Sequence, residues 1–332
     1  MRLKLLGTAL SAALASFLCA PAGTLAAGEG AQAADDYPNH SVRIINPFPP
    51  GSSDTVARLL SEHLGKSLKQ TFYIDNKPGA SGALGTNMVA KAPADGYTLL
   101  FHTCAHAISA VSFKDLPYDA VKDLDPVSRV ADSPMVLVAN PKLPAQSVQQ
   151  LIALAKSKPK SLNYASNGPG SITSLAMIMF QGMTGTQITD IPYKGAGPSL
   201  TALMAGEVDV MIAPLGAVSA YLKAGRLKAL GIASSHRSPQ APDLPTVSEA
   251  GVPGFEATCW YGVLAPHGTP QPIVGLLNRH IGDAMRSAEM QKQLAAIGVE
   301  PATSTPAEFG SYIQSEIGKW GKVFKDSGAT PE

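Results

Sequence analysis

The sequence predicts an α/β protein of two domains, and three observations lead to that fold class. Short apolar runs alternate with amphipathic segments along most of the chain, a pattern typical of strands joined by helical crossovers. About 300 residues remain after a leader segment, enough for two domains with a cleft between them. Glycine-containing turns follow several strands, at the edge where open α/β sheets bind ligands. We therefore expect doubly wound domains with parallel strands.

The predicted strands begin at residue 42, and each is followed by a turn or a helix. The first ends at the Pro-Pro-Gly segment over residues 49–51, and the others are bounded by similar turn residues. A further apolar run covers residues 261–265. The strands predicted in this way cover residues 42–46, 72–75, 97–103, 135–139, 162–166, 188–193, 208–213 and 227–233.

The predicted helices have capping residues at their starts and apolar residues on one face. Ser53 and Asp54 are expected to cap the first helix, and Ser147 caps a later one. The last helix places Phe309, Ile313, Ile317, Trp320 and Phe324 on one face. The helices predicted in this way cover residues 54–68, 84–91, 199–205, 218–224 and 306–325, with others from Ser147, Ser171 and Pro272.

Residues 1–33 have the pattern of a cleavable signal peptide. Basic residues precede an apolar stretch over residues 5–20, which is too short to span a bilayer comfortably, and Ala31 and Ala33 frame an A-x-A cleavage site. No later segment is apolar over a membrane-spanning length. We therefore expect an exported, periplasmic protein.

The cysteines leave two alternatives open. Cys19, in the leader, allows a lipid anchor as an alternative to simple cleavage. Cys104 and Cys259 remain in the mature chain, and an oxidising compartment would let them pair. Their spacing does not decide the matter. We expect two separate buried thiols, because a domain of this size needs no disulfide.

Composition and motifs argue against nucleic-acid binding and against common classes of hydrolase. The net charge is +1 and charged residues make up 15% of the chain, so no basic stripe for nucleic acid is visible. No G-x-S-x-G elbow or H-E-x-x-H motif is present, and Ser81 does not match the elbow spacing. We expect no catalytic residue, metal or cofactor. A hydrolase whose triad assembles in space remains an alternative.

Three loops at the carboxyl ends of strands are candidates for binding an anion. They cover residues 48–54, 166–173 and 193–199, and each opens a predicted helix. Free backbone N–H groups and the positive end of a helix receive carboxylate oxygens well, and glycine lets the ligand approach the backbone closely. Together the loops predict a binding site for a small carboxylate.

Motifs spread over the whole mature chain carry a resemblance to one family. They are PFPPG at 47–51, SDTVARLL at 53–60, DGYTLL at 95–100, LPYDAVKDLDPVS at 116–128, LNYAS at 162–166, PYKGAGPSL at 192–200, LPTVSEAG at 244–251, PGFEATCWYGVLAP at 253–266 and KWGKV at 319–323. On these motifs the chain resembles the solute-binding proteins of tripartite tricarboxylate transporters, the Bug receptors.

The resemblance implies a type II periplasmic-binding-protein fold with two domains. Domain 1 would comprise residues 38–138 plus 260–332, and domain 2 residues 139–259, with two crossing strands as the hinge. It also implies a carboxylate in the cleft, delivered to the permease subunits of a tripartite transporter. We expect a monomer. A subunit that senses the ligand for a membrane signalling protein remains an alternative.

Carried onto this chain, the resemblance assigns ligand contacts to all three loops and to the end of the third strand. Most of these groups are backbone amides and hydroxyls. The residues are Phe48, Ser52, Ser53, Thr103, His106, Ser166, Asn167, Gly170, Ser171, Thr173, Tyr193, Lys194, Gly195 and Ala196.

The chain departs from the family pattern at positions that bear on the ligand. The loop over residues 51–54 looks one residue short, the strand ending at Ala213 lacks an aspartate common in the family, and Ala196 stands where serine is frequent. The far end of the pocket is then less polar, which fits an aromatic or otherwise apolar carboxylate at least as well as an amino dicarboxylate. For His106 we weigh a ligand contact against a histidine bonded within its loop, and we expect Trp260 and Tyr261 to pack.

Overall fold

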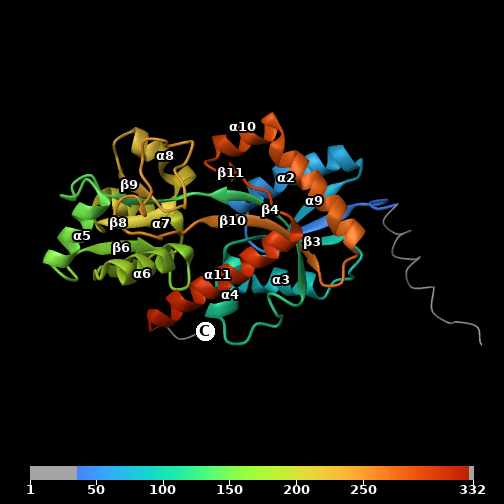
Figure 1. Cartoon of the computed structure of the whole chain (residues 1–332), viewed down its shortest axis with the longest axis horizontal. Helices are drawn as coiled ribbons and strands as arrows, with labels where there is room; N and C mark the ends of the chain where they lie inside the picture. The colour runs from blue at the N-terminus through green and yellow to red at the C-terminus, as the bar shows by residue number, and fades with distance from the viewer. Residues whose placement is uncertain (1–35, 329–332) are drawn as a thin grey trace, which may run out of the picture.

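The computed structural model describes residues 36–328 and contains two β-sheets with helices packed against them (Figure 1). The first sheet has the order β11-β4-β10-β3-β1-β2, and the second has the order β7-β6-β8-β5-β9. The strands of the first sheet are β1 (Val42–Asn46), β2 (Phe72–Asn76), β3 (Thr98–Thr103), β4 (Leu124–Ser133), β10 (Cys259–Pro266) and β11 (Glu300–Pro301). Those of the second are β5 (Met135–Ala139), β6 (Asn163–Ser166), β7 (Thr189–Pro192), β8 (Val210–Pro214) and β9 (Lys228–Ile232).

The helices follow the chain from one sheet to the other and back. A short 3₁₀ turn, η1 (Ala80–Gly82), precedes α3. The helices beside the first sheet are α2 (Ser52–Leu68), α3 (Ala83–Ala90), α4 (Ala105–Ser112), α9 (Gln271–Arg286), α10 (Ala288–Ala296) and α11 (Pro306–Asp326) (Figure 1). Those beside the second are α5 (Val148–Ser157), α6 (Ile172–Thr184), α7 (Ala196–Ala205) and α8 (Leu215–Lys223) (Figure 1).

Both sheets are mixed, so the prediction of parallel sheets is wrong in part. Strand β1 is parallel to β2 and β3, and β6 is parallel to β7 and β8. In contrast, β10 is antiparallel to β3 and β4, and β5 is antiparallel to β8 and β9. Strand β4 passes directly into β5 through Pro134, and β10 brings the chain back. Parallel neighbours require a crossover connection, usually a helix. The connections from β4 to β5 and from β9 to β10, which the structure describes in full, contain no helix, and β4, β5 and β10 lie antiparallel to neighbours in their sheets.

Helix α11 packs across the boundary between the two sheets. It contacts α4 and β4 beside the first sheet and α6 beside the second. Phe309, Ile313, Trp320 and Phe324 are buried and Ile317 is partly buried, which confirms the predicted apolar face. The aromatic residues of this helix therefore join the two halves of the molecule into one core.

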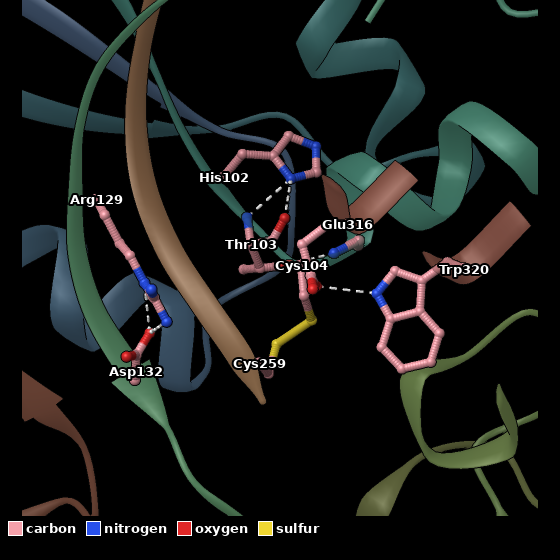
Figure 2. The surroundings of a disulfide bond; sticks show 9 residues. His102, Thr103, Cys104, Arg129, Asp132, Cys259, Glu316 and Trp320 are labelled. Atoms are coloured by element: carbon pink, nitrogen blue, oxygen red, sulfur yellow. Dashed lines mark hydrogen bonds and ion pairs between the residues drawn. A yellow bond between two sulfur atoms is a disulfide. The ribbon is translucent and has the colours of Figure 1, made fainter. Parts of the chain in front are cut away.

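Cys104 and Cys259 form a disulfide, so the expectation of separate thiols is wrong (Figure 2). Cys104 directly follows β3 and Cys259 begins β10. Because these strands pair with Thr103 opposite Tyr261, the two cysteine Cα atoms lie 5.1 Å apart. Their sequence separation of 155 residues could not reveal this, since it does not show that β10 lies beside β3.

The predicted signal peptide lies outside the described residues. Among the helices of residues 36–328, none combines the length and the apolar character needed to cross a membrane.

Candidate ligand-binding site

The first predicted loop joins β1 to α2. Helix α2 begins at Ser52 after Gly51, and no side chain caps it, so the predicted capping by Ser53 and Asp54 is wrong. Asp54 lies in the first turn and pairs with Arg58 at 2.8 Å. The first N–H groups of the helix have no partners within it and are available to an anion.

The predicted contacts of this loop differ in exposure. Ser52 is exposed, whereas Ser53 is buried within 3.4 Å of the side chain of Asn46. Phe48 is partly buried, and its ring meets that of His102 edge-on at 5.3 Å between centroids. Phe48 and Ser52 therefore offer surface to a ligand, and Ser53 holds the loop against β1.

Thr103 and His106 are both buried at the start of α4. The hydroxyl oxygen of Thr103 accepts a hydrogen bond from the N–H of Ala105 at 3.2 Å. His106 has no exposed surface, and its Nε2 atom lies 2.9 Å from the carbonyl oxygen of Ala120. Burial lowers the pKa of His106 to about 4 and the pKa of His102 well below its ordinary value, so both rings are neutral near pH 7. Of the two alternatives for His106, its burial and its bond to Ala120 favour a histidine held by the protein over a direct ligand contact.

The second predicted loop is held in shape by its own side chains. The hydroxyl of Ser166 accepts from the N–H of Gly168 at 3.2 Å, and that of Thr173 accepts from the N–H of Asn167 at 2.9 Å. Ser166 and Thr173 are almost fully buried, whereas Asn167 is partly exposed. The side chains of the loop itself therefore fix the shape of the turn.

Ser171 caps α6, which begins where the sequence predicts a helix. Its hydroxyl donates to the carbonyl of Gly168 at 2.6 Å and accepts from the N–H of Ser174 at 3.3 Å. Gly170, next to it, has φ of 69°, a left-handed conformation that favours glycine. The first N–H groups of a helix have no carbonyl partners within it, and such helix starts can receive an anion.

The third predicted loop is bonded to the second. The N–H of Tyr193 donates to the carbonyl of Ser166 at 2.9 Å. The hydroxyl of Ser199, in α7, lies 3.1 Å from Asn167 Oδ1 and 2.9 Å from the carbonyl oxygen of Gly195. Tyr193 and Gly195 are partly buried, and the exposed predicted contacts of this loop are Lys194 and Ala196.

A cavity of about 330 Å³ lies where α4 faces α6 and the end of α11. Gly170 is the predicted contact that lines it, beside the unpredicted Ser109, Ser112 and Asp190. A β-carbon on Gly170 would lie 3.8 Å from that of Ser112, so the second loop closely approaches α4. The cavity thus adjoins the turn at the start of α6.

The sequence reasoning missed these lining residues for identifiable reasons. Ser109 and Ser112 belong to α4, which was not predicted, and Asp190 lies within a segment taken only as a strand. The sequence does contain one indication of Asp190: an acidic residue inside a short predicted strand, two positions before Pro192, is unusual and suggests a role at the surface of a site. Among the described residues, no hydrogen bond joins residues 48–53 to the second or third loop.

No group of three or more His, Cys, Asp or Glu side chains in the described part of the chain is arranged to hold a metal ion. The charged groups around the disulfide have partners of their own. Arg129 bonds Asp132 on β4, and Glu316 accepts from the indole of Trp320 at 3.0 Å on α11 (Figure 2). These groups lie beside the disulfide and stabilise the junction of the sheets.

Comparison with protein families matches residues 56–329 to a model described as the tripartite tricarboxylate transporter family receptor. The chain is 42% identical to the protein BugT of Bordetella pertussis over 299 residues, which cover 89% of this chain and 92% of BugT. The match therefore extends over nearly the whole of both proteins.

Solved structures also match over most of this chain. Rpa4515 of R. palustris with adipate is 37% identical, with a TM-score of 0.78, over 90% of this chain and 100% of that one. MatC of Rhodopseudomonas palustris with bound malate is 34% identical, with a TM-score of 0.72, over 86% and 99%. The periplasmic binding protein BugD is 30% identical, with a TM-score of 0.73, over 88% and 99%.

Proposed function

This chain belongs to the tripartite tricarboxylate transporter receptor family, and from that premise we propose that it captures a small organic carboxylate between its two domains and delivers it to membrane permease subunits. It is a solute receptor with the two-domain periplasmic-binding-protein fold. We place domain 1 at residues 38–138 plus 260–332 and domain 2 at residues 139–259, with the strand connections between the sheets as the hinge.

The observation that supports this function most is the preformed turn before α6. Its hydroxyls are occupied by bonds within the turn, so a ligand carboxylate is received by backbone N–H groups, as helix N-termini receive anions. A turn that needs no rearrangement binds with less entropic cost than a mobile one. The starts of α2 and α7 supply further free N–H groups.

The predicted contacts divide by exposure into two roles. The buried or internally bonded ones, which hold the loops, are Ser53, Thr103, His106, Ser166, Ser171 and Thr173. Those that offer surface and are proposed to contact the ligand are Phe48, Ser52, Asn167, Gly170, Tyr193, Lys194, Gly195 and Ala196.

The related structures with adipate and malate support a small carboxylate as the ligand class for this chain as well. We propose that the protein binds its ligand without chemical change. The test is thermal unfolding with a panel of mono- and dicarboxylates, followed by recovery of each compound. A raised melting temperature with the compound recovered intact supports a receptor. No shift with any carboxylate contradicts the function, and conversion of a compound contradicts the absence of catalysis.

Binding should also close the domains, because a ligand that bridges both stabilises only the closed state. Small-angle scattering should then show a smaller radius of gyration at saturating ligand, and light scattering should show a monomer. An unchanged radius would contradict closure.

We propose that the protein works in the periplasm after removal of residues 1–33. The amino terminus of protein recovered by osmotic shock should lie near Ala34. An intact amino terminus on cytoplasmic protein would contradict export.

A further inference from the structure

The cavity between α4, α6 and α11 contains one acidic side chain among the described residues that line it, that of Asp190 in β7. The rest of its wall consists of hydroxyl groups and apolar side chains, among them Ser109, Ser112, Ile108 and Leu175. No lysine, arginine or histidine of residues 36–328 lines it. The cavity therefore presents negative charge with no cation to offset it.

Asp190 is anchored to α6 by one hydrogen bond. Its Oδ2 atom accepts from the hydroxyl of Ser174 at 3.2 Å. Its Oδ1 atom is buried, and the phenol of Tyr164 on β6 also interacts with the carboxylate. A carboxylate that lines a cavity without a cation beside it favours a guest that brings positive charge.

The charge of Asp190 affects the neighbouring phenol of Tyr164. Tyr164 lies opposite it in parallel register on β6. Burial raises the pKa of the Tyr164 phenol, and the charge of Asp190 raises it further. The carboxylate thus disfavours a second negative charge beside it, whether on a side chain or on a ligand.

Asp190 is one helical turn away from the proposed carboxylate site at the start of α6. Its partner Ser174 follows the cap Ser171 by three residues, a rise of about 4.5 Å along the helix. Gly170 and Asp190 line the same cavity. A ligand whose carboxylate rests on the first turn of α6 can therefore place a group a few carbons away beside Asp190.

We infer that this receptor selects carboxylates that carry a protonated amine at their far end, and that Asp190 is the residue that recognises the amine. The inference rests on the proposed carboxylate-binding function and names its ligand class. An ammonium group brings hydrogen-bond donors and a compensating positive charge to the carboxylate. A dicarboxylate of the same length would bring a second negative charge to Asp190.

The test is calorimetric titration of the mature protein with three matched pairs of acids. In each pair the carbon number is the same and only the terminal group differs: 4-aminobutanoate with succinate, 5-aminopentanoate with glutarate, and 6-aminohexanoate with adipate. In the best-binding pair, the amino acid should bind at least tenfold more tightly than the dicarboxylate. Asp190→Asn should weaken binding of the amino acid at least tenfold. The ratio of the affinities for the amino acid and the dicarboxylate should fall or invert.

The variant Asp243→Asn is the matched control, since it makes the same change on an exposed side chain. It should leave both affinities within twofold of the native protein. Asparagine at position 190 can still accept from Ser174, and thermal unfolding checks the fold. If Asp190→Asn does not fold, the inference is judged on the native protein alone, by whether it binds the amino acid of each pair more tightly than the dicarboxylate.

The outcomes separate the two proposals. Dicarboxylates that bind as tightly as their amino partners, or an Asp190→Asn variant with native affinities, would overturn the inference and leave the receptor function intact. If none of the six acids binds, and no carboxylate raises the melting temperature, the receptor function fails and this inference fails with it.

Discussion

The hydroxyl of Ser199 lies 3.1 Å from Asn167 Oδ1, so the first residues of α7 are bonded to the turn that precedes α6. Ser199 is fully buried and also reaches the carbonyl oxygens of Ser166 and Gly195. Two loops that the chain separates by a helix and a strand thereby behave as one unit. The contact makes the geometry of one loop depend on the other.

Ser199→Ala should therefore loosen both loops. We expect the free energy of unfolding to fall by about 1–3 kcal/mol, because the variant leaves buried acceptors without their donor. Carboxylate affinity should fall as well. The control is Thr201→Ala on the same helix, where an exposed hydroxyl bonds the carbonyl of Gly197 and the loss should be under about 0.5 kcal/mol. Equal stabilities of the two variants in urea would contradict the coupling.

Gly170→Val should reduce carboxylate binding at least tenfold, or abolish it. Valine is strained at φ of 69°, and its branched side chain would project toward Ser112 and the cavity. Gly185→Val is a matched control at the other end of α6, since Gly185 has φ of 65° and open space around it. It carries the same backbone strain but should bind like the native protein. If both variants bind alike, the ligand does not contact the turn before α6.

Removal of the disulfide should destabilise the native state by about 2–5 kcal/mol, because the bond limits the freedom of a long loop in the unfolded chain. The double variant Cys104→Ser and Cys259→Ser should unfold at lower urea concentration than the native protein. Reducing agent should lower the midpoint of the native protein and leave that of the double variant unchanged. A native midpoint that is insensitive to full reduction would show that the bond contributes little.

The buried histidines should make the protein less stable in acid. An unfolded histidine titrates near pH 6.5, whereas burial lowers the pKa of His106 to about 4. Between these values the unfolded chain binds a proton that the folded chain does not, so stability falls as pH falls. The slope contributed by one histidine is at most about 1.4 kcal/mol per pH unit.

His106→Gln should flatten that slope, since glutamine does not titrate and can still donate to Ala120. The exposed His40 provides the control, and His40→Gln should keep the native dependence. Urea midpoints measured from pH 7 to pH 4.5 distinguish them. An unchanged slope in His106→Gln would mean that His106 does not cause the acid sensitivity.

Sequence patterns located the elements whose signals are local. Strands β1 and β5 have the predicted limits, because each is a short, mainly apolar run between turn residues. Ser147 caps its helix as predicted, and the helix predicted from Ser171 begins there, since a cap depends only on the next three residues. These signals are complete within a few positions of the chain.

Elements stabilised by distant partners were missed. Strand β4 carries Arg129 and Asp132, which pair with each other, while the Arg129 guanidinium lies 4.2 Å from the centre of the Tyr312 ring on α11. Helix α4 has small residues and no side-chain cap, and α11 covers it. The predicted turn before α6 is present, but the part of the cavity formed by Asp190 depends on how α4, α6 and α11 pack. No local pattern contains that information.

The single residue between β4 and β5 determines how one connection between the sheets can bend. Ser133 is paired with Cys259 in the first sheet, and the carbonyl of Pro134 accepts from Leu215 at the start of α8 beside the second sheet. The proline ring also fixes its own φ. The main soft torsion at this junction is then the ψ angle of Ser133. Because the chain also returns to the first sheet through β10, a rotation of the second sheet would have to change this bond together with the backbone that enters β10.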